Sequence, residues 1–238
     1  MKYKNDIILF SQAGVYMKRL NIFVDETGEF GYGEGASLLY GISFTFHEQD
    51  NDISNELNNL NMRLKRIGYT GMIHMADLIM HRGVYSKYNI KIRKSIFNSI
   101  YQFSRKIPVK YHTIIIDKKY IDNGSVLRKH IINEINKMIK ANEVYFSKFD
   151  KIVLYYDNGQ APLGYILDSL FIRFSSYEHK ADFDHEEKRL FQVSDMLTFV
   201  DKALYKHEKN IKYEKAELYF FGNNELRKIS KELNKKRL

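Results

Sequence analysis

Arg19–Gly28 (RLNIFVDETG) is an apolar run that ends in an acidic pair and a glycine. This pattern is typical of a buried strand followed by a tight turn. A second run, Ala36–Phe46 (ASLLYGISFTF), follows a glycine-rich connection and predicts an antiparallel partner strand. The beginning of the chain therefore predicts a hairpin that places Asp25 at the end of its first strand.

The rest of the chain alternates between strand-like and helical patterns. Clear strands are expected at Val109–Ile116 and Lys151–Tyr156, and shorter ones at Met72–Met75 and Ala181–Asp184. Helices are predicted over residues 53–67, 84–105, 125–138, 163–174, 190–204 and 223–236. An antiparallel start followed by alternation indicates an α/β fold, in which helices flank a mixed sheet.

Length and composition favour one globular domain over residues 1–238. Within it we expect an N-terminal extension (1–17), a helical insertion at about 48–106 and a basic final helix (223–238). The absence of cysteine excludes disulfides and cysteine-ligated zinc, which fits a cytoplasmic protein. No apolar stretch is long enough for a bilayer span, so no membrane association is expected.

Positive charge is concentrated toward the end of the chain. The net charge is +9, from 38 basic and 29 acidic residues. Such a surface attracts phosphates, which makes nucleic acid, DNA or RNA, the expected partner. A solvated lysine-rich surface is the alternative interpretation. The candidate contacts are Lys202, Arg227 and Lys231.

Three aspartates stand where catalysis in an α/β sheet is usually found. Asp25 and Asp157 end predicted strands, and ligand sites gather at the carboxyl ends of such strands. Asp195 lies on the predicted helix 190–204, beside its apolar stripe and on one face with Lys202. Grouped carboxylates repel one another and recruit cations, and Mg²⁺ or Mn²⁺ prefers oxygen ligands. We therefore expect Asp25, Asp157 and Asp195 to be metal ligands.

Several assignments stay open at the level of sequence. Asp117 also ends an apolar strand and competes with Asp157 for the place beside Asp25. Glu26 is either a further ligand or a turn residue. His74 is a proton shuttle, an extra ligand or a hydrogen-bonded histidine of structural importance only.

Four short motifs contain the candidate site residues: Phe23–Gly28 (FVDETG), Met72–Met75 (MIHM), Tyr155–Asp157 (YYD) and Gln192–Leu197 (QVSDML). Together they resemble a microbial family, domain of unknown function 3800, whose members open with Asp-Glu-Ser-Gly and end with a Gln-x-Ala-Asp helix. The likeness spans about Leu20 to Ala203, and Thr27 and Ser194 depart from the pattern, each by a small residue. The resemblance implies a ribonuclease H-like fold and an acidic site of Asp25, Glu26, Asp157 and Asp195, with His74 nearby.

The expected function is a divalent-metal-dependent nuclease, or a related phosphoryl-transfer enzyme, that acts on nucleic acid. Two ions held by carboxylates stabilise the attacking and leaving oxygens of a phosphodiester. The alternative is a module of the same fold that binds nucleic acid or another partner without catalysis. Such a module would fit a phage-defence or mobile-element system.

Overall fold

The structure is a computed structural model that describes residues 17–31, 36–121, 123–212 and 214–238. Apart from Met17, the predicted N-terminal extension lies outside the described residues, as does part of the glycine-rich connection between the first two strands. In the described part of the chain, no helix has both the length and the apolar character needed to cross a membrane.

Five strands form one mixed sheet in the order β3-β2-β1-β4-β5. β2 runs antiparallel to both of its neighbours, whereas β1, β4 and β5 run parallel to one another. This order and these directions confirm the predicted mixed sheet, with β1 at its centre. The strands are β1 (Arg19–Thr27), β2 (Leu39–Glu48), β3 (Val109–Asp117), β4 (Lys151–Tyr155) and β5 (Tyr177–Lys180).

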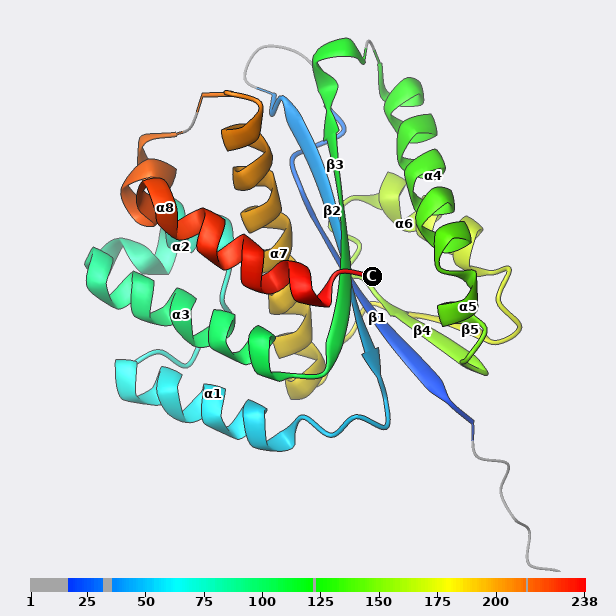
Figure 1. The fold of residues 1–238 in the computed structure, drawn as a ribbon, viewed down its shortest axis with the longest axis horizontal. Coiled ribbons are helices and arrows are strands. Elements are labelled where there is room, and N and C mark those ends of the chain that lie inside the picture. The colour runs from blue at the N-terminus through cyan, green and yellow to red at the C-terminus, as the bar shows by residue number, and fades with distance from the viewer. Residues whose placement is uncertain (1–16, 32–35, 122, 213) are drawn as a thin grey trace, which may run out of the picture.

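Helices cover both faces of the sheet (Figure 1). One face carries α1 (Ser54–Ile67), α2 (Met75–Met80), α3 (Ile90–Lys106), α7 (His185–Glu208) and α8 (Lys215–Leu233). The other face carries α4 (Gly124–Ala141), α5 (Glu143–Phe146) and α6 (Ala161–Phe171). Short 3₁₀ turns complete the chain: η1 (Gly83–Lys87), η2 (Lys118–Tyr120) and η3 (Asn234–Lys236).

The central strand β1 sends alternate side chains into two separate cores. Phe23 packs into the core beneath α7, whereas Ile22 and Val24 pack into the core beneath α4 and α6. Successive side chains of a strand point to opposite faces. Asp25 therefore continues the α7 side, and Glu26 continues the α6 side.

A buried polar network fixes α7 on the sheet. The Ser194 hydroxyl hydrogen-bonds with the Phe23 carbonyl (2.9 Å) and with the Thr45 hydroxyl (2.7 Å). Ser43 donates to the Ser194 carbonyl (2.7 Å), and the Thr198 hydroxyl hydrogen-bonds with that of Ser43 (2.6 Å). Every hydroxyl in this fully buried interface has a partner, so serine is well tolerated at the position where the resembled family carries alanine.

Three of the predicted elements differ in the structure. Met72–Met75 is not a strand but leads into α2, because the Met72 carbonyl accepts hydrogen bonds from the Tyr69 and Tyr85 hydroxyls. Ala181–Asp184 is not a strand either, because Asp184 caps α7. The final helix begins earlier than predicted, at Lys215, and is kinked at Gly222, whose φ of 60° suits glycine.

Candidate active site

Asp25 lies where the pairing of the central strand changes. On one side it stands opposite Ser43 in β2. On the other side the parallel pairing with β4 ends at Phe23 and Tyr155. Asp25 and Asp157 each follow that last pair by two residues, so both lie at the same edge of the sheet. The strands that carry the two residues, β1 and β4, are neighbours in the sheet.

Helix α7 brings Asp195 to the same edge. Asp195 follows Ser194, whose side chain and carbonyl anchor the helix to β1 and β2. Its carboxylate is half-buried and accepts a hydrogen bond from the Met75 backbone N–H (2.8 Å) at the beginning of α2. Segments far apart in the sequence therefore meet at this carboxylate.

The acidic side chains oppose the ionisation of one another. Burial raises the pKa of Asp25 well above its ordinary value, and the charges of Asp195, Glu26 and Asp157 raise it further. Burial also raises the pKa of Asp195, against the lowering effects of the Met75 N–H and of His74. Uncompensated carboxylates of this kind either hold a proton or attract a cation.

Glu26 occupies a different environment on the opposite side of β1. Burial raises its pKa to about 7, although hydrogen bonds with Tyr156 and Gln160 favour the ionised form. Its Oε2 atom is buried without a hydrogen-bond partner among the described residues. A buried polar atom without a partner is rare in folded proteins and favours a missing donor, proton or ion.

A cavity of about 310 Å³ opens between these groups. We call it the acidic cavity; it is lined by Asp25, Glu26, His74, Ala76, Asp77 and Asp195. His74 is exposed at its wall, directly before α2. The sequence-predicted residues Asp25, Glu26, Asp195 and His74 are therefore brought together.

Asp157 and Asp117 are separated clearly by their positions. Asp157 is exposed at the acidic edge, and its Oδ1 accepts the Gly159 N–H (3.0 Å) in the turn after β4. Asp117 lies opposite Leu39 on β3, two strands away from β1, and accepts the Lys119 N–H (2.9 Å) as the cap of η2. Of the two, Asp157 is the one that acts electrostatically on Asp25.

The three basic candidates are not equivalent. Lys202 lies two helical turns after Asp195 and donates a hydrogen bond to the Thr27 hydroxyl (2.7 Å). Arg227 and Lys231 are exposed on α8 and do not line the acidic cavity. Only Lys202 is therefore part of the surroundings of the carboxylates.

The carboxylates of the site are the kind of ligand that Mg²⁺ or Mn²⁺ prefers, but their side chains lie too far apart to coordinate one ion as they stand. Carboxylate oxygens are the ligands that these ions prefer. Within the described ranges, no three His, Asp or Glu side chains stand close enough together to hold an ion as they are. Asp157 and Asp195 each direct one oxygen to a backbone N–H and keep the second, so three-residue coordination of an ion requires side chains to move closer together.

Two residues of this region lie outside the predicted metal ligands and nucleic-acid contacts. Asp77 lines the acidic cavity and raises the pKa of Asp195. Arg82 lies on the short connection between α2 and η1, near the same edge. Their signal in the sequence is weak, because α2 and η1 are too short to show a helical period.

The sheet order and the cluster at the end of its central strand define an α/β protein with a five-stranded mixed sheet and an acidic edge. Neither a known family nor a curated protein matches the chain. Among solved structures it is similar to a chain of the PCNA:RNase HII complex from Archaeoglobus fulgidus, with 14% identity and a TM-score of 0.38. That likeness covers 91% of this chain and 89% of the other, and says nothing about activity.

Proposed function

We propose that the protein is a divalent-metal-dependent nuclease or a related phosphoryl-transfer enzyme that acts on nucleic acid. The observation that carries the proposal is the position of Asp25, half-buried at the end of the central strand and surrounded by the charges of Asp195, Glu26 and Asp157. Four carboxylates in one place are unfavourable unless protons or cations offset them.

Asp25 and Asp195 would hold the metal ion, with Asp157 as the third ligand after its side chain turns from the Gly159 N–H. The buried Oε2 of Glu26 is a further donor without a partner among the described residues. When bound, Mg²⁺ or Mn²⁺ supplies Lewis-acid stabilisation of phosphodiester oxygens and lowers the pKa of a bound water.

The remaining side chains supply positioning and proton transfer. The His74 imidazole stands at the cavity wall, where it can accept a proton from a water or donate one to a leaving oxygen. Met75 N–H fixes the orientation of the Asp195 carboxylate. The α7 network keeps Asp195 at a set distance from β1, which such chemistry requires.

The experiment is cleavage of labelled DNA, RNA and hybrid duplexes with Mg²⁺ or Mn²⁺, compared between wild type and Asp25→Asn. We expect the variant to lose activity on the order of 10²–10³-fold or more. It should also lose Mn²⁺ binding measured by calorimetry, while it keeps or gains thermal stability because a repelled charge is removed.

Asp117→Asn is the matched control, because Asp117 also ends a strand and accepts a backbone N–H. It should leave both Mn²⁺ binding and cleavage unchanged. Equal activity and equal Mn²⁺ binding in wild type and Asp25→Asn would refute the proposal. Nucleic-acid binding without cleavage or metal dependence would favour the non-catalytic module instead.

We also propose that the chain belongs to the domain of unknown function 3800 family. In support, the first and last resembled motifs carry Asp25 and Asp195, which line one cavity although 170 residues separate them in the sequence. An alignment of homologues in which either aspartate varies freely would contradict this membership.

A further inference from the structure

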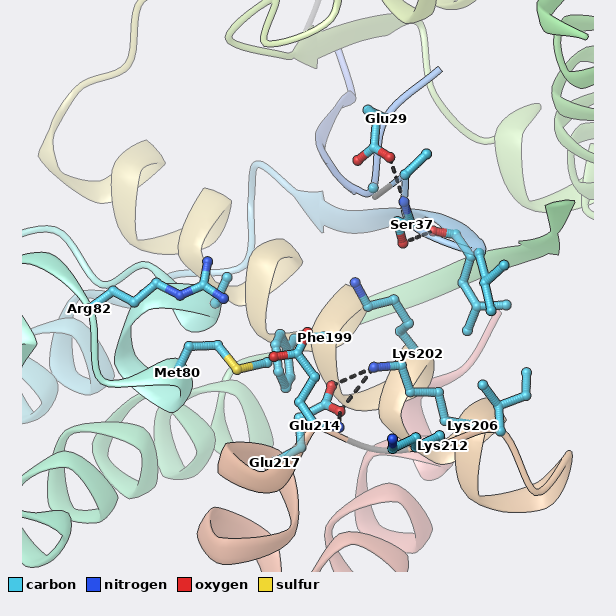
Figure 2. Close-up of a pocket in the computed structure, with 16 residues that line it drawn as sticks. Glu29, Ser37, Met80, Arg82, Phe199, Lys202, Lys206, Lys212, Glu214 and Glu217 are labelled. Carbon is cyan, nitrogen blue, oxygen red and sulfur yellow. Dashed lines mark hydrogen bonds and ion pairs between the residues drawn. The ribbon is translucent and has the colours of Figure 1, made fainter. Parts of the chain in front are cut away.

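A larger cleft of about 510 Å³ adjoins the acidic cavity. The two share Ala76 in their walls, so they lie on either side of the beginning of α2. The cleft is bounded by the end of β1, the beginning of β2, the α2–η1 connection, α7 and the segment that enters α8 (Figure 2). Its charged lining residues are Glu29, Arg82, Lys202, Lys206, Lys212, Glu214 and Glu217.

The carboxylates of the cleft already have partners within the chain. Glu217 is buried and binds Lys206 through both oxygens (2.8 and 2.9 Å). Glu214 caps α8 by accepting a backbone N–H. Glu29 accepts the Ser37 N–H (2.6 Å) and lies 3.8 Å from the Lys118 ammonium. Among the described residues, Lys206 is therefore the one cation of the cleft that these acids hold in a direct ion pair.

Lys202 and Arg82 form no such ion pair in the described part of the chain. Lys202 is half-buried and donates a hydrogen bond to the neutral Thr27 hydroxyl. Burial and the charge of Lys206 lower the pKa of Lys202, whereas the charges of Glu217, Glu214 and Glu29 raise it and offset this effect only in part. Arg82 is exposed, and neither side chain forms an ion pair within 4.0 Å in the described part of the chain. Figure 2 shows Arg82 and Lys202 extending into the cleft from different elements.

The position of Lys202 links the cleft to the acidic cavity. Seven residues separate Lys202 from Asp195 on α7, and residues seven apart share a helix face. Its charge lowers the pKa of Asp195, and its partner Thr27 stands two residues after Asp25. An anion held at Lys202 is therefore next to the carboxylates, where a polyanion would otherwise be repelled.

We infer that this cleft, through Arg82 and Lys202, binds a backbone phosphate of the substrate strand next to the phosphodiester that lies at the acidic cavity. The inference rests on the proposed function and names the surface that brings the substrate to that site. A phosphodiester offers the single charge and hydrogen-bond acceptors that a guanidinium and an ammonium bind together. The two side chains are then positioning residues for the substrate.

The test is fluorescence anisotropy with a short labelled oligonucleotide, single-stranded or duplex, in EDTA so that no cleavage takes place. Lys202→Gln and Arg82→Gln should each weaken binding by about 3- to 10-fold, and lower the slope of log affinity against log salt by about 1. Glutamine at position 202 retains the ability to hydrogen-bond Thr27, which protects the fold. Lys129→Gln, an exposed lysine of α4 on the other face of the sheet, is the matched control and should bind as wild type does.

Replacing one charged phosphate of the oligonucleotide by a neutral group distinguishes a specific phosphate contact from general electrostatic attraction. Oligonucleotides with one methylphosphonate, moved along the strand, should show a position where wild type loses affinity and Lys202→Gln loses nothing further. Equal affinity of Lys202→Gln, Arg82→Gln and wild type, or an equal loss in Lys129→Gln, would overturn the inference. If Asp25→Asn cleaves normally while Lys202→Gln binds weakly, the proposed function fails and the cleft remains a phosphate site.

Discussion

The two sides of β1 surround two neighbouring acids, Asp25 and Glu26, with different kinds of side chains. On the α7 side, Asp25 lies among other carboxylates and next to a network of serine and threonine hydroxyls. On the α6 side, Glu26 has Tyr156 and Gln160 as partners and a core of apolar side chains behind it. The α7 side places several carboxylates together, whereas on the α6 side tyrosine and glutamine hydrogen bonds favour the ionised form of one carboxylate.

This difference shows how one strand supplies two acids of unlike character. Asp25 is governed by both burial and other carboxylates, so its ionisation depends on what binds in the cavity. For Glu26 burial is the largest influence, and it is opposed by its hydrogen bonds, so its ionisation depends mainly on the fold. Substitutions on each side should therefore have separable effects on activity and on stability.

The largest effect on stability is expected where α7 is anchored. Ser194→Val adds bulk to a fully buried contact and leaves the Thr45 hydroxyl without its partner. We expect a loss of about 2–4 kcal/mol in the free energy of unfolding, measured by urea denaturation. Ser194→Ala, which removes only the hydrogen bonds, should cost about 1 kcal/mol. If the two variants were equally stable, the tight packing of α7 on β1 would be disproved.

The next largest effect is the pH dependence of stability that Glu26, on the α6 side of β1, should cause. The folded protein keeps the Glu26 proton up to about pH 7, whereas the unfolded chain loses it near the ordinary value of 4.5. The stability that Glu26 contributes is therefore complete below about pH 4.5 and declines as the pH rises toward about 7. Glu26→Gln cannot ionise and escapes this decline.

We expect Glu26→Gln to be more stable than wild type by about 1–3 kcal/mol near pH 8, with the difference vanishing near pH 5. Thermal unfolding in EDTA at several pH values measures it, as a shift in Tm of roughly 2–4 °C per kcal/mol. A difference in Tm that is the same at every pH would show that the carboxyl is not protonated in the fold.

The smallest effect compares two strand-end aspartates. Asp117→Ala and Asp157→Ala each remove one hydrogen bond to a backbone N–H, so each should cost about 0.5–1 kcal/mol. Only Asp157→Ala should lower metal-dependent cleavage, because Asp157, unlike Asp117, acts electrostatically on Asp25. Equal cleavage by the two variants would remove Asp157 from the site.

Much of the fold follows from patterns that are local in the sequence. The long apolar runs predict β1 to β4, and apolar spacing predicts the major helices, because each of these elements buries a full face. The rule that strand ends share one edge also predicts the approach of Asp157 to Asp25. Choosing Asp157 over Asp117 needed the strand order, which no local pattern contains.

The parts that the sequence missed depend on tertiary contacts. The segment Met72–Met75 has apolar residues that suit a strand, but its Met72 carbonyl accepts hydrogen bonds from the Tyr69 and Tyr85 hydroxyls and not from another strand. The cleft formed by Arg82 and Lys202 joins two elements that are distant in sequence. The residues around Arg82 contain no pattern that predicts that Arg82 and Lys202 line the same cleft.

Helix α7 fixes the distance between Asp195 in the acidic cavity and Lys202 in the neighbouring cleft. It carries Asp195 and Lys202 at a separation of about 10 Å along its axis, which the rise of 1.5 Å per residue determines. Loops can lengthen or shorten over evolution, but a helix keeps this spacing. Compounds that bridge the carboxylates and the ammonium should therefore show a sharp optimum in linker length.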